Sequence, residues 1–329
     1  MRGINPWGET MSRGNISVAA LMLCVALATL TKAQSVSNEP AAVQQHVDAA
    51  RKLAGTRYKT AMERLCLPPD KRPRPTFGDL NIEPVRLFDN LYLVGLANVY
   101  SWVVDTPDGI VVLDTLNNAK DAEQTIIGGM KKLGLDPSRI KYVVITHAHG
   151  DHFGGAPYLK EHFGARVLAT AESWHEMEMI KPGGANFAPP PQRDMIVSDG
   201  QKLTVGGTAF TFLLTPGHTP GTLSVIVPVT DHGERHVAYI LSGPRTETAE
   251  TTTQMLASTE KLLNLAKSMH VDIELTNHSY VDDSLPVVEA IRHRKAGEPN
   301  AYLVGEDGVQ KYLGWQAECL RADIARTAK

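Results

Sequence analysis

The sequence predicts an α/β fold in which two packed, mixed β-sheets carry helices on their outer faces. Short apolar, β-branched runs dominate residues 85–113 and residues 209–241, which indicates two strand-rich halves. Between and after these halves, strand-like runs alternate with helical segments, which supply the covering helices. With 329 residues, 43% hydrophobic and 21% charged, the chain is long enough for one large domain or two average ones.

The expected elements follow one another along the chain. In the first strand-rich half, the turn-forming pair Asp108-Gly109 separates two apolar runs, which is a hairpin signal. Elsewhere, short apolar runs between turn-forming residues predict strands, and longer segments predict helices. The predicted strands are 85–88, 91–94, 101–104, 110–113, 141–145, 167–169, 209–214, 223–227, 237–241 and 271–275, and the predicted helices are 121–133, 156–163, 171–180, 251–269 and 285–294.

The N-terminal segment differs in composition from the rest of the chain. Arg2 and Arg13 precede an apolar run at 16–30, and Thr31-Lys32-Ala33 supplies the small residues of a cleavage site. This order is typical of a secretory signal peptide over residues 1–33, with cleavage after Ala33 and export to a bacterial periplasm or to the medium. A transmembrane anchor is the alternative, although the apolar run is short for one.

Residues 34–75 are expected to form a helical extension and a Pro-rich linker ahead of a main domain at 76–329. The segment 40–67 is rich in Ala, Lys and Arg, whereas the prolines of 68–75 cannot continue a helix. We therefore expect the main fold to begin near residue 76.

Two cysteines, Cys66 and Cys319, remain after the predicted signal cleavage. An oxidising compartment would allow them to pair, which would tie the extension to the C-terminal helix. Two buried free thiols are the alternative.

The formal net charge of −3 gives no indication of a nucleic-acid or membrane-surface binder. The sequence also contains no internal repeat and no coiled-coil heptads. We therefore expect a small-molecule substrate as the partner, no nucleic acid and, after signal cleavage, no membrane. The oligomeric state stays open.

The most informative segment is Thr146-His147-Ala148-His149-Gly150-Asp151-His152, which follows the strand predicted at 141–145. Three imidazoles and one carboxylate therefore stand in a loop at a strand end, where a rigid scaffold commonly supports a site. Imidazole and carboxylate are ligands that suit zinc. A solvated His-rich turn is the alternative, but four potential ligands within six residues argue against it.

Two further histidines stand at strand ends. His218 lies in the Pro/Gly turn that follows the strand at 209–214, and His278 follows the strand at 271–275. A lone histidine at a strand end is more often a surface or packing residue, but these sequence frames favour metal ligands. The remaining histidines lack such frames and are expected to be solvated or packing residues: His46, His162, His175, His232, His236, His270 and His293.

In these motifs the chain resembles the metallo-β-lactamase superfamily over residues 83–294. The shared features are Asp114 at a strand end, the motif from His147 to His152, Gly217-His218 and His278. The resemblance implies an αββα sandwich with two zinc ions per chain along one edge of the sheets. It also implies two ligand sets, one of His147, His149 and His218, the other of Asp151, His152 and His278.

The residues at the end of the strand 237–241 distinguish branches of that superfamily. Many of its thioesterases and lactonases bridge the two metals with an Asp there, and β-lactamases of the first two subclasses carry a Cys. Residues 238–244 of this chain offer neither. The chain therefore resembles the third subclass, whose second metal is held by Asp and two His. Ser242 aligns with a serine that helps to bind the substrate carboxylate there, although Leu241 replaces the Asp that often precedes it.

The predicted function is zinc-dependent opening of a β-lactam by a metal-bound hydroxide, with Asp151 binding the second zinc and orienting the hydroxide. Asp114 would accept a hydrogen bond from a ligand histidine, or else cap a turn. Residues 181–191 would form a substrate loop with Phe187 as an apolar contact, or else an ordinary surface loop. Alternative functions are hydrolysis of lactones or other esters and, less favoured, zinc binding without catalysis.

Overall fold

The computed structural model describes residues 39–73, 75–180, 188–243, 246 and 248–327. The predicted signal peptide and residues 181–187 of the predicted substrate loop lie outside these ranges. Over the described ranges, no helix combines the length and the apolar character needed to cross a membrane.

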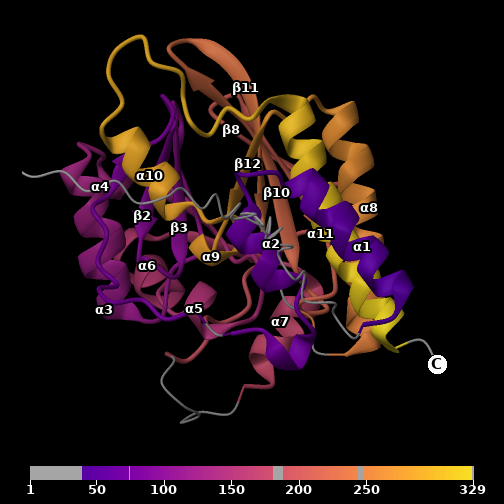
Figure 1. The fold of residues 1–329 in the computed structure, drawn as a ribbon. Coiled ribbons are helices and arrows are strands. Elements are labelled where there is room, and N and C mark those ends of the chain that lie inside the picture. The colour runs from indigo at the N-terminus through magenta and orange to yellow at the C-terminus, as the bar shows by residue number, and fades with distance from the viewer. Residues whose placement is uncertain (1–38, 74, 181–187, 244–245, 247, 328–329) are drawn as a thin grey trace, which may run out of the picture. The chain divides into compact units, whose positions relative to one another are not determined.

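In the described part of the chain, the strands form two sheets (Figure 1). The first has the order β1-β2-β3-β4-β5-β6-β7, antiparallel from β1 to β4 and parallel from β4 to β7. Thr106 pairs with Gly109 across the turn between β3 and β4, which confirms the predicted hairpin. The strands are β1 (Val85–Arg86), β2 (Leu91–Gly95), β3 (Tyr100–Thr106), β4 (Gly109–Leu113), β5 (Ile140–Val144), β6 (Arg166–Ala169) and β7 (Met195–Ile196).

The second sheet has the order β12-β11-β10-β9-β8 and is also mixed. Its pairs are antiparallel except for β11 and β12, which run parallel. The strands β7 and β8 were not predicted from the sequence, and both are short. The strands are β8 (Lys202–Val205), β9 (Thr208–Leu214), β10 (Leu223–Asp231), β11 (Glu234–Leu241) and β12 (Ile273–Thr276).

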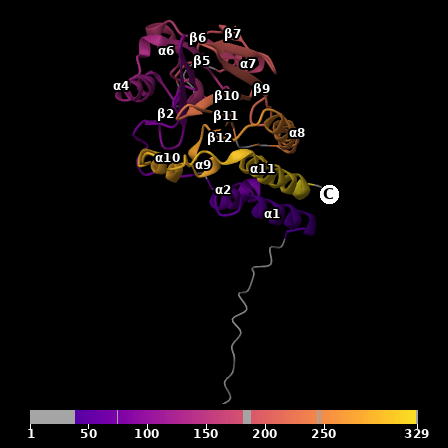
Figure 2. The ribbon, with the colours of Figure 1, turned by 90° about the horizontal axis from the view of Figure 1, so that it is seen from above.

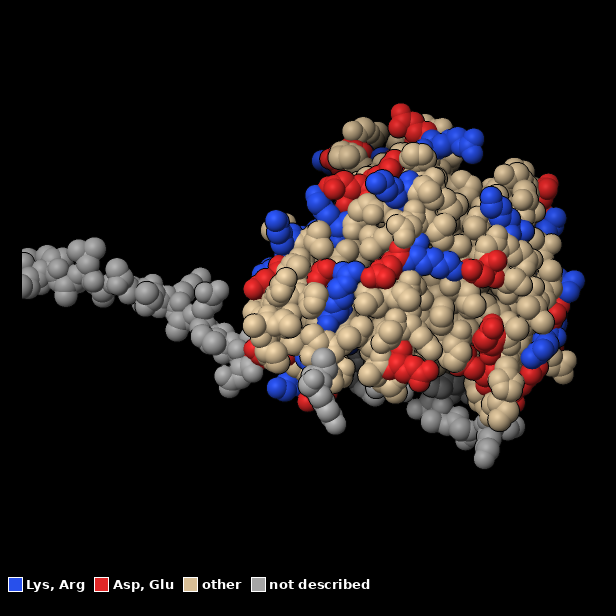
Figure 3. Space-filling view, turned by 90° about the vertical axis from the view of Figure 1, so that its right-hand side faces the viewer, with Lys and Arg blue, Asp and Glu red and all other residues tan. Residues whose placement is uncertain are grey.

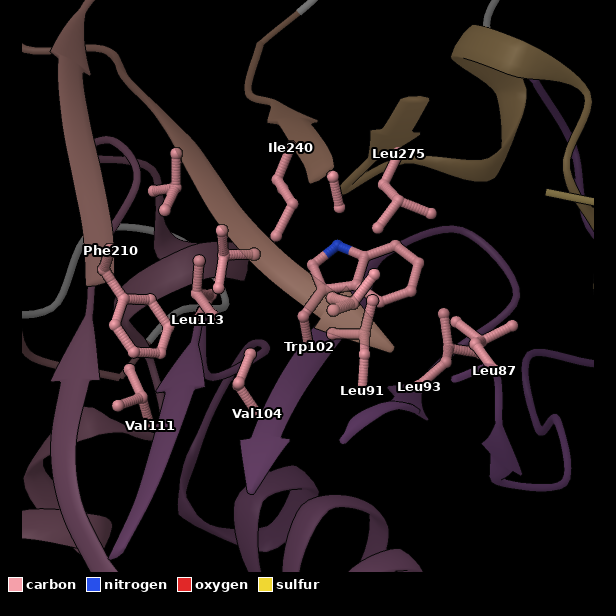
Figure 4. Packing of buried hydrophobic residues seen from close by; sticks show 14 of the residues in the cluster. Leu87, Leu91, Leu93, Trp102, Val104, Val111, Leu113, Phe210, Ile240 and Leu275 are labelled. Carbon is pink, nitrogen blue, oxygen red and sulfur yellow. The ribbon is translucent and has the colours of Figure 1, made fainter. Parts of the chain in front are cut away.

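The main core lies between the two sheets. Figure 4 shows Trp102 and Val104 of β3 with Phe210, Ile240 and Leu275 of the second sheet, and all five belong to one buried apolar cluster. The side chains of β3 alternate, since the intervening Val103 belongs to a different cluster on the outer face of the first sheet.

Helices cover the outer face of each sheet, so the predicted sandwich of two mixed sheets with external helices is confirmed. The first sheet is covered by η2 (Ala122–Ile127), α4 (Gly128–Lys132), α6 (Ala156–Phe163) and α7 (Ala171–Glu178), and α3 (Ala119–Asp121) leads directly into η2. The second is covered by α8 (Ala249–Ser268) and α11 (Gly305–Thr327), and α1 (Ala41–Ala54) and α2 (Lys59–Leu65) pack against α11, as Figures 1 and 2 show. The remaining helical segments are η1 (Pro69–Lys71), η3 (Pro137–Arg139), α5 (Gly150–Phe153), α9 (Ser279–Asp282) and α10 (Leu285–Arg292).

The predicted N-terminal extension packs against the C-terminal helix. Its helical segment is divided into α1 and α2 at Gly55, whose φ of 57° a glycine adopts readily. A disulfide joins Cys66, directly after α2, to Cys319 of α11, with the two Cα atoms 4.7 Å apart. Residues Glu39–Lys329 together form one compact unit.

Charges of both signs are interspersed on the face that Figure 3 shows, and neither sign gathers into a large patch there. This distribution agrees with the small net charge of −3.

Candidate metal centre

The six predicted ligands come from three strand ends. The chain leaves β5 at Val144 and passes through His147 and His149 into α5, a short helix that carries Asp151 and His152. The sequence predicted a loop at this position, so the helix α5 is a difference from that prediction. His218 lies in the turn between β9 and β10, and His278 lies two residues after the end of β12 and directly before α9. Ligands from both sheets therefore meet at one place.

The first ligand group consists of His147, His149 and His218. The Nε2 atoms of His147 and His218 each lie 3.1 Å from Nδ1 of His149. Tetrahedral zinc with nitrogen ligands at about 2.0–2.1 Å places those nitrogens roughly 3.3 Å apart. The spacing of the three imidazoles therefore fits one zinc ion.

The second ligand group consists of Asp151, His152 and His278. The Nε2 atoms of the two histidines are 3.1 Å apart, and Oδ2 of Asp151 lies 3.5 Å from His152 and 3.8 Å from His278. The two groups adjoin, because the ring centroids of His147 and His152 are 3.9 Å apart. This donor set of five imidazoles and one carboxylate fits a pair of zinc ions or similar borderline cations.

The protein environment keeps two buried ligands in the neutral form that binds a metal. Burial, helped by His152 and His218, lowers the pKa of His147 well below its usual value. Burial and His152 likewise lower the pKa of His278 to about 4. Burial acts in the same direction on His152, but Asp151 and Asp114 outweigh it and raise the pKa of that imidazole.

Asp114 orients the ring of His152 by contacting the ring nitrogen that faces away from the other ligands of the second group. Its Oδ2 accepts a hydrogen bond from Nδ1 of His152 at 2.8 Å, which leaves Nε2 directed at the other ligands. The same carboxylate accepts from the backbone N–H and the hydroxyl of Thr146, both at 2.8 Å, and from Nδ2 of Asn277 at 2.9 Å. The side chain is buried, so these four donors replace the water that would otherwise solvate its charge.

Ser242 contacts the first group through His147. Its Oγ lies 2.8 Å from Nδ1 of His147 and donates to Oγ1 of Thr146 at 2.7 Å, while Nδ2 of Asn277 donates to it at 3.0 Å. Thr146 in turn donates to Asp114, so a ligand histidine from each group is connected to the same carboxylate. Ser242 is only 2% exposed, and its contact with a substrate carboxylate stays a prediction.

Several residues that support the candidate ligands could not be predicted from the sequence, including Thr146, Asn277 and Asn98. The backbone carbonyl of Asn98 accepts a hydrogen bond from Nδ1 of His278 at 2.8 Å. Gly243 has a φ of 69°, and a Cβ atom there would lie 2.3 Å from Cδ2 of His218. A glycine is therefore required for His218 to keep its place.

Several of the histidines predicted to be structural have carboxylate partners away from the ligand groups. His46 contacts Glu318 at 2.7 Å, His236 contacts Asp272 at 2.6 Å, and His270 contacts Glu306 at 3.0 Å.

The chain is similar to proteins of known family and structure. A family model described as the metallo-beta-lactamase superfamily matches residues 94–232. Among solved structures, BJP-1, a subclass B3 metallo-beta-lactamase of Bradyrhizobium japonicum, is 25% identical with a TM-score of 0.60, covering 77% of this chain and 92% of that chain. A metallo-beta-lactamase of Cronobacter sakazakii with a HARLDQ motif is 26% identical with a TM-score of 0.60, covering 71% of this chain and 91% of that chain. FEZ-1 of Legionella gormanii, at 23% identity, has the same fold with a TM-score of 0.63 and covers 74% of this chain and 96% of that chain.

Curated relatives match over shorter segments. A hydroxyacylglutathione hydrolase of Acidiphilium cryptum is 30% identical over 131 residues, which are 40% of this chain and 45% of that protein. A hydroxyacylglutathione hydrolase of Pseudomonas aeruginosa is 37% identical over 90 residues, 27% of this chain and 29% of that protein. The chain thus covers less than half of the length of these two relatives. Ser242, Asn277 and His278 lie beyond the segment that the family model matches.

Proposed function

Since this chain belongs to the metallo-beta-lactamase superfamily, we propose that it is a zinc-dependent hydrolase that opens the cyclic amide of β-lactams. The observation that carries the proposal is the composition of the second ligand group, in which Asp151 stands with two histidines. Among the described residues at the end of β11, Ser242 contributes a hydroxyl to the support of His147, and none belongs to either ligand group. The likeness to a solved subclass B3 enzyme agrees with this ligand pattern.

The reaction needs a nucleophilic water beside the carbonyl carbon of the substrate. When bound, zinc supplies Lewis acidity and lowers the pKa of a coordinated water to about 7. Burial raises the pKa of the Asp151 carboxyl, but the neighbouring His152 acts in the opposite direction and the net pKa is lowered, so Asp151 is deprotonated at neutral pH. Its carboxylate would therefore accept a hydrogen bond from the attacking water and orient it.

The other ligand residues fix the geometry of this step. Ser242 and Asp114 contact Nδ1 of His147 and of His152, so the Nε2 lone pairs of both imidazoles point to the centre. Because these contacts are buried, the ligands are held in place before the substrate arrives.

The proposal is tested by measuring hydrolysis of nitrocefin and a carbapenem by the purified, zinc-reconstituted protein. We expect turnover that a chelator abolishes and added zinc restores, and Asp151→Asn should lower it strongly. Absence of turnover at high enzyme concentration, in protein shown to hold zinc, would reject β-lactam hydrolysis.

A second candidate is hydrolysis of a thioester, which the identity to hydroxyacylglutathione hydrolases favours. Against it stands the sequence from Ala238 to Gly243, which lacks the Asp that bridges the metals in many thioesterases of the superfamily. Lactones and a glutathione thioester in the same panel distinguish these substrates from β-lactams.

We also propose that the protein is exported. The disulfide between Cys66 and Cys319 supports this location, because such bonds persist in oxidising compartments. Cell fractionation with N-terminal sequencing of the mature protein tests it, and a cytoplasmic protein that still begins at Met1 would contradict it.

A further inference from the structure

We infer that Arg64 of α2 is a positioning residue for the second ligand group, because it holds the short helix α9 that begins directly after His278. The inference rests on the metal site of the proposed function. It assigns a role in metal binding to the N-terminal helical segment, which lies before the residues that the family model matches.

Arg64 and its helix bind the far end of α9. Nη2 of Arg64 donates to the backbone carbonyl of Tyr280 and to Oδ1 of Asp283, the latter at 3.3 Å. From one turn earlier in α2, the backbone N–H of Ala61 donates to Oδ2 of Asp283 at 2.6 Å. The guanidinium carbon of Arg64 also lies 6.0 Å from the ring centroid of Tyr280, within the range of a cation–π contact. Figures 1 and 2 both show α2 beside α9.

The helix α9 depends on such support. It has four residues, far fewer than an isolated helix needs to be stable. It ends at Asp282, and the residue that caps this end, Asp283, has a φ of 57°, in the left-handed region that a residue with a Cβ atom rarely adopts. The carboxylate of Asp283 is the group that Ala61 and Arg64 bind, so α2 stabilises the uncommon backbone conformation that ends α9.

The position of α9 is coupled to the position of the His278 ring. His278 is the residue that caps the start of the helix, and its carbonyl accepts a hydrogen bond from the backbone N–H of Val281 at 3.0 Å. The ring of Tyr280 lies against the imidazole, with the two centroids 5.0 Å apart and the planes tilted by 33°. Asn98 holds Nδ1 of His278 from another direction. A displacement of Tyr280 would therefore move one of the three ligands of the second group.

The effect should be selective for the second metal ion. The hydrogen bonds and the ion pair described for Arg64 go to Tyr280 and Asp283, whereas His147, His149 and His218 are supported by residues such as Ser242 and Gly243. A general loss of stability would weaken both ions alike, whereas loss of a positioning contact at α9 would weaken the second ion first.

The experiment is a zinc titration of the metal-free full chain in competition with a chromophoric chelator, for wild type, Arg64→Ala and Arg64→Lys. We expect wild type to bind two ions, and Arg64→Ala to bind the second about tenfold more weakly with the first unchanged, the size typical of a residue that orients a ligand. Arg64→Lys keeps a cation beside Asp283 and should recover part of the loss. Arg51→Ala is the control, because Arg51 forms an exposed ion pair with Asp48 on α1.

The outcomes separate this inference from the proposed function. Fewer than two ions bound by wild type would contradict the proposed metal site. Two ions bound equally well by wild type and Arg64→Ala would overturn the inference, even if Arg64→Ala melts at a lower temperature. If Arg64→Ala does not fold, Asp283→Asn is measured in its place, because Asn tolerates the left-handed region while losing the charge that Arg64 binds. A loss of both ions to the same extent in the variant that folds would also overturn it.

Discussion

Asp114→Asn tests the buried carboxylate that is connected to both ligand groups. Asparagine has the same shape as aspartate and tolerates the positive φ of 63° at this position, so the backbone is expected to keep its conformation. The change removes the charge and turns one of the two oxygens into an NH2 donor. Every contact of the Asp114 side chain described above is made to a donor, so the new amide has no position in which all of them are satisfied.

The size of the effect follows from the two orientations of the amide. If the NH2 group takes the place of Oδ2, this NH2 donor lies against Nδ1 of His152 and the donor Nδ2 of Asn277. With its NH2 in place of Oδ1, it faces the backbone N–H of Thr146. Each buried donor left without an acceptor costs about 1–3 kcal/mol of stability. In the first orientation His152 would favour the tautomer that carries its proton on Nε2, which removes the lone pair from the second metal site.

We expect the second zinc ion to bind roughly 10 to 100-fold more weakly in Asp114→Asn, equivalent to about 1.4–2.7 kcal/mol. The first ion should be affected less, since the contacts of His147 reach Asp114 through Thr146, either directly or by way of Ser242. Zinc competition titration measures both affinities, and urea unfolding of the metal-free protein measures the loss of stability. Asp307→Asn, at a side chain 80% exposed, is the control. A second-ion affinity within twofold of wild type would refute the assigned role of Asp114.

Two further variants test other features. Gly243→Ala should weaken the first zinc ion at least tenfold, because its Cβ would lie 2.3 Å from the ring of His218. Gly233→Ala is the matched control, with a φ of 84° and no atom within 4 Å of the added Cβ; equal zinc affinities in the two variants would contradict the steric argument. Glu274→Gln should make the stability of the protein depend less on pH. Burial, and to a smaller extent the neighbouring Asp282, raise the pKa of Glu274 well above its usual value, and burial raises the pKa of Asp282 to about 7. When a group has a higher pKa in the folded than in the unfolded protein, its contribution to stability is fully present at pH values below the unfolded-state pKa and is lost as the pH rises through the folded-state pKa. Between about pH 5 and pH 8, the free energy of unfolding of the metal-free wild type should therefore fall more than that of Glu274→Gln. Urea unfolding at several pH values measures this, with the variant Glu306→Gln at an exposed position as the control. If the free energies of unfolding of wild type and Glu274→Gln changed equally with pH, the prediction would be wrong.

The residues of the two candidate metal groups were predictable because their chemistry is visible locally. His147, His149, Asp151 and His152 are four candidate ligands in six residues after a buried strand, and His218 lies in a Pro/Gly frame. The alternation of apolar runs was likewise enough to predict two sheets with outer helices, since strand and helix periods differ.

The supporting residues were not predictable in the same way. Thr146, Asn277 and Arg64 are ordinary polar residues whose roles arise only where distant strands and helices meet. Arg64 and Tyr280 are 216 positions apart in the chain, and no local pattern connects them. The short elements α5 and α9 were missed for a related reason, because tertiary contacts rather than helix propensity stabilise four-residue helices.

The disulfide between Cys66 and Cys319 joins the segment between these residues, which is most of the chain, into one covalently closed ring. The two cysteines are 253 positions apart, and all six predicted metal ligands lie between them. A single peptide-bond cleavage anywhere within this ring opens it without dividing the molecule. After a first cut by a protease the two polypeptide pieces stay linked by the disulfide, so both ligand groups remain in one covalently connected molecule until a second cut or reduction of the disulfide separates the pieces.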